Sequence, residues 1–238
     1  MSKRAFDNFD PFAGEYRQIH DRSLRLSGAD SDYFTEQKIA EVREIEGGRS
    51  ARILDLGCGD GNSARFFAKY FSDSEYFGLD VSEKSIAVAK RHETPHAQFA
   101  PYNGTDIPFS DNTFDIVFAA CVLHHIDREL HEVLLEEVKR VMKGGGRVYI
   151  FEHNPFNPVT RRIVKNCPFD EDAVLLSPFY TRRILTKLKF DNVSINYTIF
   201  FPRFSLFKKI LHWEKYLRWM PFGGQYFANS TKKRISTG

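Results

Sequence analysis

The stretch ILDLGCGDGN, from Ile53 to Asn62, decides the fold of this 238-residue chain. It opens with apolar residues typical of a buried strand, continues through glycines at 57, 59 and 61, and leads into a helical pattern. A second apolar run ends at Asp80. A strand, a glycine turn, a helix and a strand-end acid form half of a nucleoside-binding sheet, in which the acid accepts hydrogen bonds from the ribose hydroxyls.

The glycine spacing narrows the choice of nucleoside. Dinucleotide sites use Gly-x-Gly-x-x-Gly, so that a pyrophosphate can lie against a helix N-terminus. Here the glycines alternate, and Asp55 stands two residues before the first of them. No Lys-Ser/Thr pair follows, so the stretch is not a phosphate-binding P-loop.

The pattern Asp-x-Gly-x-Gly-x-Gly resembles the first motif of the class I S-adenosylmethionine (SAM)-dependent methyltransferases, in particular the small-molecule "methyltransferase type 11/12"-like superfamily. Further motifs follow in the order that this family has. They are LDVS at 79–82, NGTDIPF at 103–109, FDIVFAACVLHHI at 114–126 and VMKGGGRVYI at 141–150. Two positions depart from the family pattern: Asn103 replaces the usual Asp, and Gly144 replaces the usual Pro.

The resemblance implies SAM as the cofactor and assigns its contacts. The turn with Asp55, Gly57, Cys58 and Gly59 would hold the methionine half, and Asp80 would hold the ribose. The adenine would contact a second set of positions, namely Val81, Asn103 and Gly104, with Cys121 bordering the site after the fourth strand. The segment FDPFAGEY at 9–16 resembles a lid over the cofactor, with Tyr16 near the methionine end. The alternative is that this terminal aromatic segment only packs on the body.

The rest of the chain predicts an α/β fold. We expect strands near 51–56, 75–80, 97–101, 114–120, 147–153, 193–200 and 225–230. Helices are expected near 33–46, 62–72, 82–92, 129–142 and 177–188, with glycines 144–146 ending the fourth. This alternation demands a mostly parallel, doubly wound sheet with helices on both faces. The family would make it a Rossmann-like sheet of seven strands with an antiparallel last strand. We expect residues 1–48 to form an N-terminal lid and helical segment, and residues 49–238 to form the SAM-binding domain.

Candidate bases follow two strands at the edge where open α/β sheets bind ligands. His124 and His125 follow the fourth strand, and Glu152 and His153 follow the fifth. Since successive strand residues point to opposite faces, at most one of Glu152 and His153 points into the cleft. We expect His124, His125 or His153 to act as general base, and either of the first two could instead be a packed histidine.

Residues 204–220 predict a basic amphipathic helix, an insertion near 203–220. Its apolar stripe comprises Leu206, Ile210, Trp213, Leu217 and Met220, beside Lys208, Lys209, Lys215 and Arg218. Such a helix can lie in a membrane interface, or it can pack its stripe on the body or on a second subunit. From residue 201 onward the chain has eight Lys/Arg and one acid, although its formal net charge is only +3.

Composition excludes several classes. The three cysteines are far apart, so neither a zinc site nor a disulfide framework is expected, and we expect no metal. No apolar run is long enough to span a bilayer, and the charged N-terminus is not a signal peptide. We therefore expect a cytoplasmic protein, in contact with the inner face of the membrane if residues 204–220 bind lipid. No basic groove with interleaved aromatics indicates nucleic acid.

Together these features predict a SAM-dependent methyltransferase for a small-molecule, lipid or lipid-linked sugar acceptor. One alternative is a nicotinamide-dependent oxidoreductase, which would need the dinucleotide glycine spacing. The other is a SAM-binding or membrane-docking module without catalysis. The oligomeric state and the acceptor atom stay open.

Overall fold

The computed structural model describes residues 28–167, 173–204 and 209–234. The expected lid at 9–16, with Tyr16, lies outside these residues, as do Leu206 and Lys208. Seven strands form one sheet in the order β3-β2-β1-β4-β5-β7-β6. The first four are β1 (Arg52–Leu56), β2 (Glu75–Asp80), β3 (Ala97–Pro101) and β4 (Phe114–Ala120), and the rest are β5 (Met142–His153), β6 (Asp191–Thr198) and β7 (Gln225–Thr231).

Strand directions match the expected fold. Strands β1 to β5 pair in parallel, whereas β7 runs antiparallel to both β5 and β6. The prediction of an antiparallel last strand inserted beside its predecessor is therefore confirmed. The strand order reverses between β1 and β4, and ligands of open α/β sheets bind outside the carboxyl ends of the strands at such a point.

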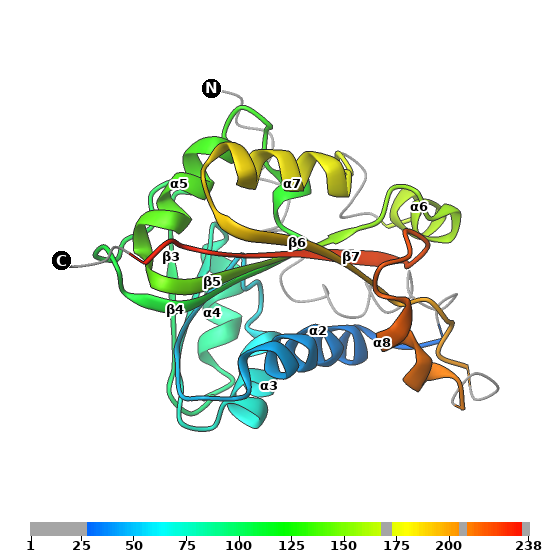
Figure 1. Cartoon of the computed structure of the whole chain (residues 1–238). Coiled ribbons are helices and arrows are strands. Elements are labelled where there is room, and N and C mark those ends of the chain that lie inside the picture. Colours follow the sequence, from blue (N-terminus) through cyan, green and yellow to red (C-terminus); the bar gives the residue numbers. More distant parts are fainter. Residues whose placement is uncertain (1–27, 168–172, 205–208, 235–238) are drawn as a thin grey trace.

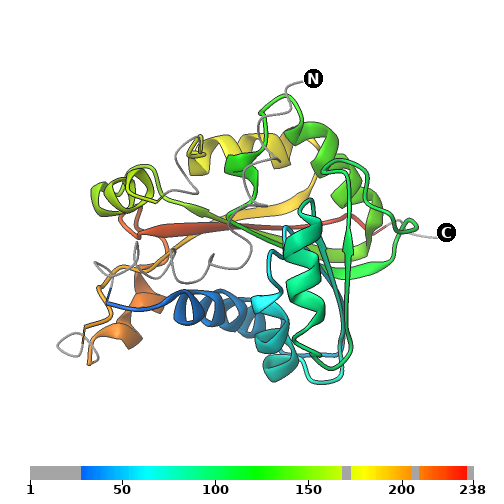
Figure 2. The ribbon, with the colours of Figure 1, turned by 180° about the vertical axis from the view of Figure 1, so that it is seen from behind.

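Helices cover both faces of the sheet (Figures 1 and 2). On one face lie α2 (Ser31–Glu46), α3 (Asn62–Tyr70) and α4 (Glu83–Lys90), and on the other α5 (His131–Val141) and α7 (Pro178–Lys187). Polar side chains cap three of these helices: Asp30, Ser82 and Ser177 each accept a hydrogen bond from a backbone N–H in the first turn of α2, α4 and α7. The sequence did not predict α6 (Pro158–Lys165), which begins at the cap Asn157.

Each face has its own hydrophobic core. On one side, Ile39 and Val42 of α2 pack with Phe67 of α3 and with Tyr149 and Phe151 of β5. On the other side, side chains of β1, β4 and β5 pack against α5 and α7. Apolar burial on this scale, at about 25 cal/mol per Å² removed from water, is the main stabilisation of such a sheet. It fixes the strand ends from which the loops of the candidate site project.

Two sequence predictions on secondary structure are wrong. Glycines 144–146 do not end the fourth helix, because α5 stops at Val141 and its C-cap Met142 is already extended. Strand β5 therefore begins at Met142, opposite Phe114 of β4, five residues earlier than expected. Within this early part Gly145 has φ +85°, and its N–H donates to the Lys232 carbonyl at 2.8 Å.

The amphipathic helix over 204–220 is the second wrong prediction. The described part of that segment contains only a 3₁₀ turn, Leu211–Trp213, and a single helical turn, α8 (Glu214–Leu217). We attribute this difference from the expected helix to Glu214. Its buried carboxylate accepts hydrogen bonds from the Phe200 and Phe201 N–H groups and pairs with Arg203 at 2.7 Å. These contacts tie the segment to the end of β6. Ile210 and Trp213 of the expected stripe are exposed. Among the described residues, no helix has the length and apolarity to cross a membrane.

Candidate active site

The glycine turn after β1 is fastened to the neighbouring strand. The N–H groups of Gly57 and Cys58 both donate to the Leu79 carbonyl, at 2.7 and 3.0 Å. Gly57 has φ +73°, and a Cβ there would lie 2.5 Å from Val122 of the loop after β4, so only glycine allows this approach. Gly59 has φ +54°, and a Cβ there would meet no atom of the described residues within 4 Å. Among these residues, the turn therefore packs closely at Gly57 and loosely at Gly59.

Asp80 stands at the end of β2 and is bound to the same turn. Its Oδ2 accepts a hydrogen bond from the Gly59 N–H at 2.8 Å, and its Oδ1 accepts one from the Ser82 N–H at 2.9 Å. The helix cap of α4 is Ser82 itself, so Asp80 does not serve as the N-cap. Asp80 and Val81 are both half-buried. This arrangement holds a carboxylate beside Gly59, at the carboxyl end of β2.

Asp55 lies deeper than the turn that it precedes. Its Oδ2 accepts hydrogen bonds from the Ser63 and Tyr76 hydroxyls, both at 2.5 Å, and its side chain is buried. Burial raises the pKa of Asp55 to about 7, although the two hydroxyls act to lower it. The described contacts of Asp55 thus brace β1 against α3 and β2, underneath the turn.

The loop after β3 forms a compact turn around Asn103. The side-chain oxygen of Asn103 accepts hydrogen bonds from the Thr105 N–H at 3.0 Å and the Asp106 N–H at 2.7 Å. Gly104 has φ +90°, which favours glycine. The side-chain oxygen of Asn103, a predicted adenine contact, therefore already holds its own loop in an Asx-type turn.

Histidines gather where β4 and β5 end. The His124 ring is buried, and its Nδ1 lies 2.5 Å from Oε2 of Glu152. The other Glu152 oxygen, Oε1, accepts a hydrogen bond from the Leu123 N–H at 3.0 Å. Ring centroids of His125 and His153 lie 4.1 and 5.4 Å from that of His124, and both of these residues are half-buried. The structure therefore brings together all three predicted histidines, with His124 innermost.

Glu152 stays ionised in spite of complete burial. Burial alone would raise its pKa, but His124, together with His153 and His125, outweighs this and holds the pKa of Glu152 below its ordinary value. On the adjacent strand β7, Tyr226 stands opposite Glu152, and its hydroxyl donates to the Leu176 carbonyl at 3.0 Å. The sequence named Glu152 only as a candidate base. Its role as partner of His124 could have been found only from the alternation of β5 combined with the β4–β5 register.

The two cysteines of the predicted site differ. Burial, together with the nearby Asp55, raises the pKa of the Cys58 thiol well above its ordinary value, so Cys58 is a neutral spacer. Cys121 has φ +60° and donates its N–H to the Phe151 carbonyl at 2.8 Å. Burial acts to raise the pKa of Cys121, but His153, Lys38 and His124 together outweigh it, and the pKa is lowered. Over the described ranges, no group of three or more His, Cys, Asp or Glu side chains could hold a metal ion.

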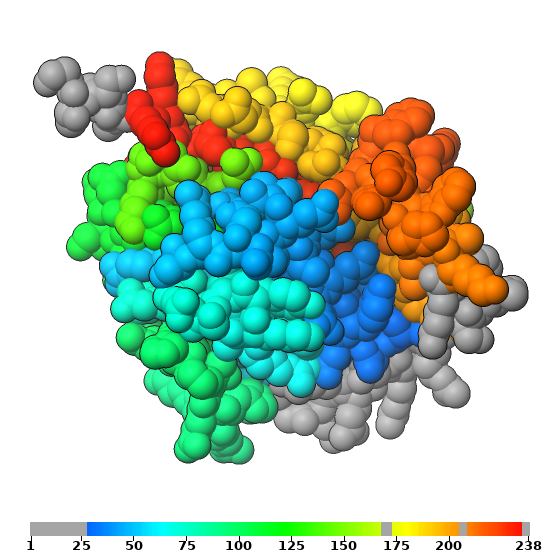
Figure 3. Space-filling view, turned by 60° about the horizontal axis from the view of Figure 1, so that its bottom comes forward, coloured from blue at the N-terminus to red at the C-terminus, as the bar shows by residue number. Residues whose placement is uncertain are grey.

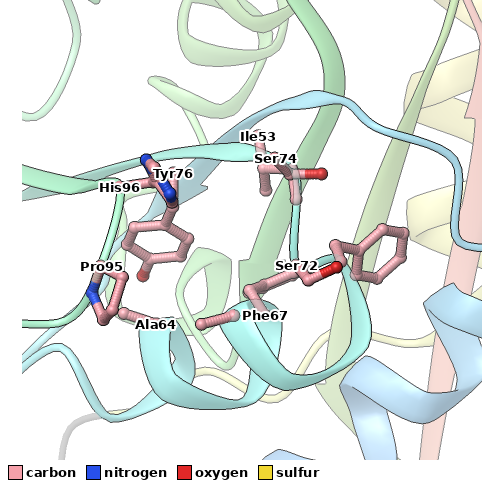
Figure 4. A pocket seen from close by; sticks show the side chains of 10 residues that line it. Ile53, Ala64, Phe67, Ser72, Ser74, Tyr76, Pro95 and His96 are labelled. Atoms are coloured by element: carbon pink, nitrogen blue, oxygen red, sulfur yellow. The ribbon is translucent and has the colours of Figure 1, made fainter.

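A cavity of about 160 Å³ lies under α3, at the other end of the strands (Figure 4). Its lining is mainly apolar and includes Phe67, Phe71 and Tyr76, with Ser74 before β2 and His96 before β3. These positions are at the amino ends of the strands, away from Gly59 and Asp80. The cavity is therefore a packing defect of the core and not part of the candidate site.

Residues 54–150 match the sequence family described as "Methyltransferase domain". The fatty-acid O-methyltransferase of Mycolicibacterium smegmatis is 35% identical over 108 residues, which are 45% of this chain and 38% of that protein. The phthiotriol/phenolphthiotriol dimycocerosates methyltransferase of Mycobacterium leprae is 31% identical over 112 residues, 45% of this chain and 40% of that protein. The matched segment thus spans less than half the length of these relatives.

Among solved structures, a SAM-dependent methyltransferase from Thermotoga maritima superposes with a TM-score of 0.69 at 18% identity, over 97% of this chain and 100% of that one. This likeness shows that the two chains share a fold. The sequence match covers residues 54–150, which include the glycine turn and Asp80. The chain therefore has the fold of the class I methyltransferases, and residues 54–150 match the methyltransferase-domain family.

Proposed function

We propose that this chain binds SAM and transfers its methyl group to a lipid or other apolar small-molecule acceptor. The proposal rests on the hydrogen bond that joins Asp80 to the glycine turn. The Asp80 carboxylate accepts it from the Gly59 N–H at 2.8 Å, and a Cβ at Gly59 would meet no atom of the described residues within 4 Å. A ribose with adjacent hydroxyls fits a fixed carboxylate, and a phosphate-free methionine moiety fits a turn that lacks the dinucleotide spacing.

The cofactor contacts are proposed residue by residue. Asp80 would accept hydrogen bonds from the ribose hydroxyls, while Gly57 and Gly59 would leave room for the methionine half. Val81 would pack against the adenine. Because the Asn103 oxygen holds its own loop and Asp55 is buried under the turn, we assign these two residues to supporting the pocket.

Bound SAM would supply an electrophilic methyl group on a sulfonium, and the protein would supply alignment and a proton acceptor. We propose His125 as the group that takes the proton from an acceptor hydroxyl, since it is half-buried next to His124. His124, which is buried and hydrogen-bonded to Glu152, would hold the His125 and His153 rings in position. His153 is the second candidate base, because its ring is also half-buried and close to His124.

The acceptor class rests on the relatives. The two named above are a fatty-acid O-methyltransferase and a dimycocerosate methyltransferase, and both names denote lipid acceptors. A lipid acceptor also suits the aromatic side chains that surround the end of β5, such as Phe156, Phe179 and Phe222, which are exposed.

The test is methyl transfer from tritiated SAM to separate pools of fatty acids, isoprenoid quinones, glycolipids and water-soluble phenols. We expect label in one lipid pool and equimolar S-adenosylhomocysteine, with neither formed by the Asp80→Ala variant. Binding of S-adenosylhomocysteine without transfer to any pool, including a total lipid extract, would instead support the module without catalysis.

A further inference from the structure

Exposed aromatic side chains gather at one end of the molecule, beside the candidate site. Six of them form what we call the aromatic surface: Phe156, Phe179, Trp213, Tyr216, Trp219 and Phe222. Each is more than half exposed, and Trp213 and Trp219 have 58% and 76% of their surface in contact with solvent. Scattered exposed apolar residues are normal, but a group of large aromatics on one side marks an interaction site.

Contacts between segments far apart in sequence show that these residues share one side. The rings of Phe156 and Phe179 lie 6.0 Å apart. Nδ2 of Asn157 donates to the Phe222 carbonyl at 2.8 Å, and so joins the loop before α6 to the segment that carries Trp219 and Phe222. Figures 1 and 2 show α6 and α8 at the same end of the sheet, and in Figure 3 the segment from residue 209 to 222 forms an edge beside α2.

Ion pairs hold the segment with the tryptophans to α2 and to the end of β6. Arg218 pairs with Glu41 and Glu44 of α2, at 2.5 and 2.7 Å. Arg203 pairs with the buried Glu214 at 2.7 Å. These ion pairs hold the backbone of the segment against α2 and the end of β6. The aromatic side chains of the segment stay exposed to solvent.

Exposed cations surround the aromatics. Arg161, Arg162 and Lys165 lie on α6, and Lys209 and Lys215 flank the 3₁₀ turn at Leu211–Trp213. Within the described part of the chain, no carboxylate pairs with any of these five. The Lys215 ammonium lies over the Tyr216 ring, 5.0 Å from its centroid. Tryptophan and tyrosine favour the headgroup level of a bilayer, and lysine and arginine are attracted to anionic lipids.

The aromatic surface is continuous with the acceptor end of the candidate site. Asn154 follows Glu152 and His153 directly, and its Nδ2 donates to the Pro221 carbonyl at 3.0 Å and the Gly223 carbonyl at 2.7 Å. The loop after β5 therefore connects the histidine cluster to the aromatic surface within a few residues. A lipid could pass from a bilayer to the cluster over this short path.

We propose that the aromatic surface docks on an anionic phospholipid bilayer, through inserted tryptophans and the cations of α6 and of the 209–215 segment. The docked orientation turns the carboxyl ends of β4 and β5 toward the lipid. The lipid nature of the acceptor rests on the proposed function, but docking itself does not require turnover.

The two tryptophans of the chain make the test direct, since Trp213 and Trp219 are the only ones and both belong to the aromatic surface. Their emission is recorded with phosphatidylcholine vesicles and with vesicles containing about a third phosphatidylglycerol, at low and high salt. We expect a blue shift, and quenching by brominated acyl chains, only with anionic vesicles. Added salt should weaken the binding.

Paired charge reversals locate the contact. Arg161→Glu with Arg162→Glu should reduce partitioning to anionic vesicles at least tenfold. The matched control is Lys90→Glu with Arg91→Glu at the end of α4, which should leave partitioning unchanged. Both variants should bind S-adenosylhomocysteine like the wild type, so loss of docking is distinguishable from loss of the cofactor site.

Three results would overturn the proposal: no spectral shift with anionic vesicles at low salt, an equal loss in the control pair, or tryptophan emission that is already blue-shifted without lipid in a dimer detected by sedimentation. The last result would show that a second copy of the chain covers the aromatic surface.

Discussion

Asp55 in β1 and Glu152 in β5 are buried to the same degree, with 1% and 0% of their surface exposed, yet their pKa values shift in opposite directions. Burial, helped by the nearby Asp80, raises the pKa of Asp55 to about 7, because the two hydroxyl groups that bond to it do not offset burial. Glu152 lies against His124, and its pKa is lowered. At equal desolvation, the neighbouring groups decide the charge.

The difference separates the two halves of the site. In the half formed by β1 and β2, hydrogen bonds between backbone and side chains fix a rigid turn, and its buried acid can be neutral. In the half formed by β4 and β5, an ionised acid orients a group of titratable rings. The first half is suited to hold a ligand, and the second is suited to accept a proton.

Removal of Glu152 should have the largest effect. We expect Glu152→Ala to lower the free energy of unfolding by about 3–5 kcal/mol, because it leaves His124 and the Leu123 N–H buried without their acceptor. Urea unfolding near neutral pH measures this loss. Glu152→Gln keeps one acceptor oxygen and replaces the other with an NH2 donor, so it should recover only part of this loss. Full recovery of stability in Glu152→Gln would show that the charge of Glu152 is not what matters.

Asp55 should make stability depend on pH in the opposite sense to an ordinary carboxylate. Because its folded-state pKa of about 7 exceeds the ordinary 3.8, the folded chain binds more protons than the unfolded chain between these values. Its contribution therefore falls as pH rises through that window. Relative to Asp55→Asn, the wild type should lose on the order of a few kcal/mol between about pH 4 and pH 8.

The matching control for this pH effect is Glu152→Gln. Glu152 has a lowered pKa, so its stabilisation is present above the ordinary 4.5 and is lost as pH falls through its folded-state pKa. The wild type should therefore lose stability relative to Glu152→Gln only on acidification. A difference between wild type and Asp55→Asn that does not change with pH would refute the account of Asp55.

His125 should affect turnover more than stability. We expect His125→Ala to lower kcat by about a hundredfold, as loss of a general base does, while the affinity for S-adenosylhomocysteine stays within about twofold. The comparison is His153→Ala, measured across the same pH range. If His153→Ala has the larger effect on kcat, the two histidines exchange roles, and if neither variant loses turnover, transfer requires only alignment.

Asp80 should affect binding more than stability. Loss of its charge-assisted hydrogen bonds, about 1.5–3 kcal/mol each, should weaken S-adenosylhomocysteine by more than tenfold in Asp80→Ala. The matched control is Asp115→Ala, at the amino end of β4. Asp115 accepts hydrogen bonds from the Arg52 N–H at 2.9 Å and from the Lys143 ammonium at 2.7 Å. That variant should lose stability without losing affinity, whereas equal affinity losses would make Asp80 a structural residue.

The two halves also differ in how far the sequence predicts them. Strands β2, β3 and β4 have the expected bounds, because local patterns of apolar residues determine them. The early start of β5 depends on pairing with Phe114, and the broken helix after residue 209 depends on Glu214 reaching the end of β6. Such long-range contacts override local helical spacing.

The candidate site follows the same division. The glycine turn and Asp80 could be predicted, since a short motif places both and the structure joins them by one hydrogen bond. The pairing of His124 with Glu152 could not, because it requires the β4–β5 register and the burial of both side chains. The same holds for the engagement of the Asn103 oxygen in its own turn.

The central claim is that the glycine turn and Asp80 form a site for SAM, and titration calorimetry of the wild-type chain with S-adenosylhomocysteine and with NAD tests it most directly. The claim predicts a dissociation constant for S-adenosylhomocysteine in the micromolar range, roughly −8 kcal/mol, and far weaker binding of NAD. NAD binding more tightly than S-adenosylhomocysteine would contradict it.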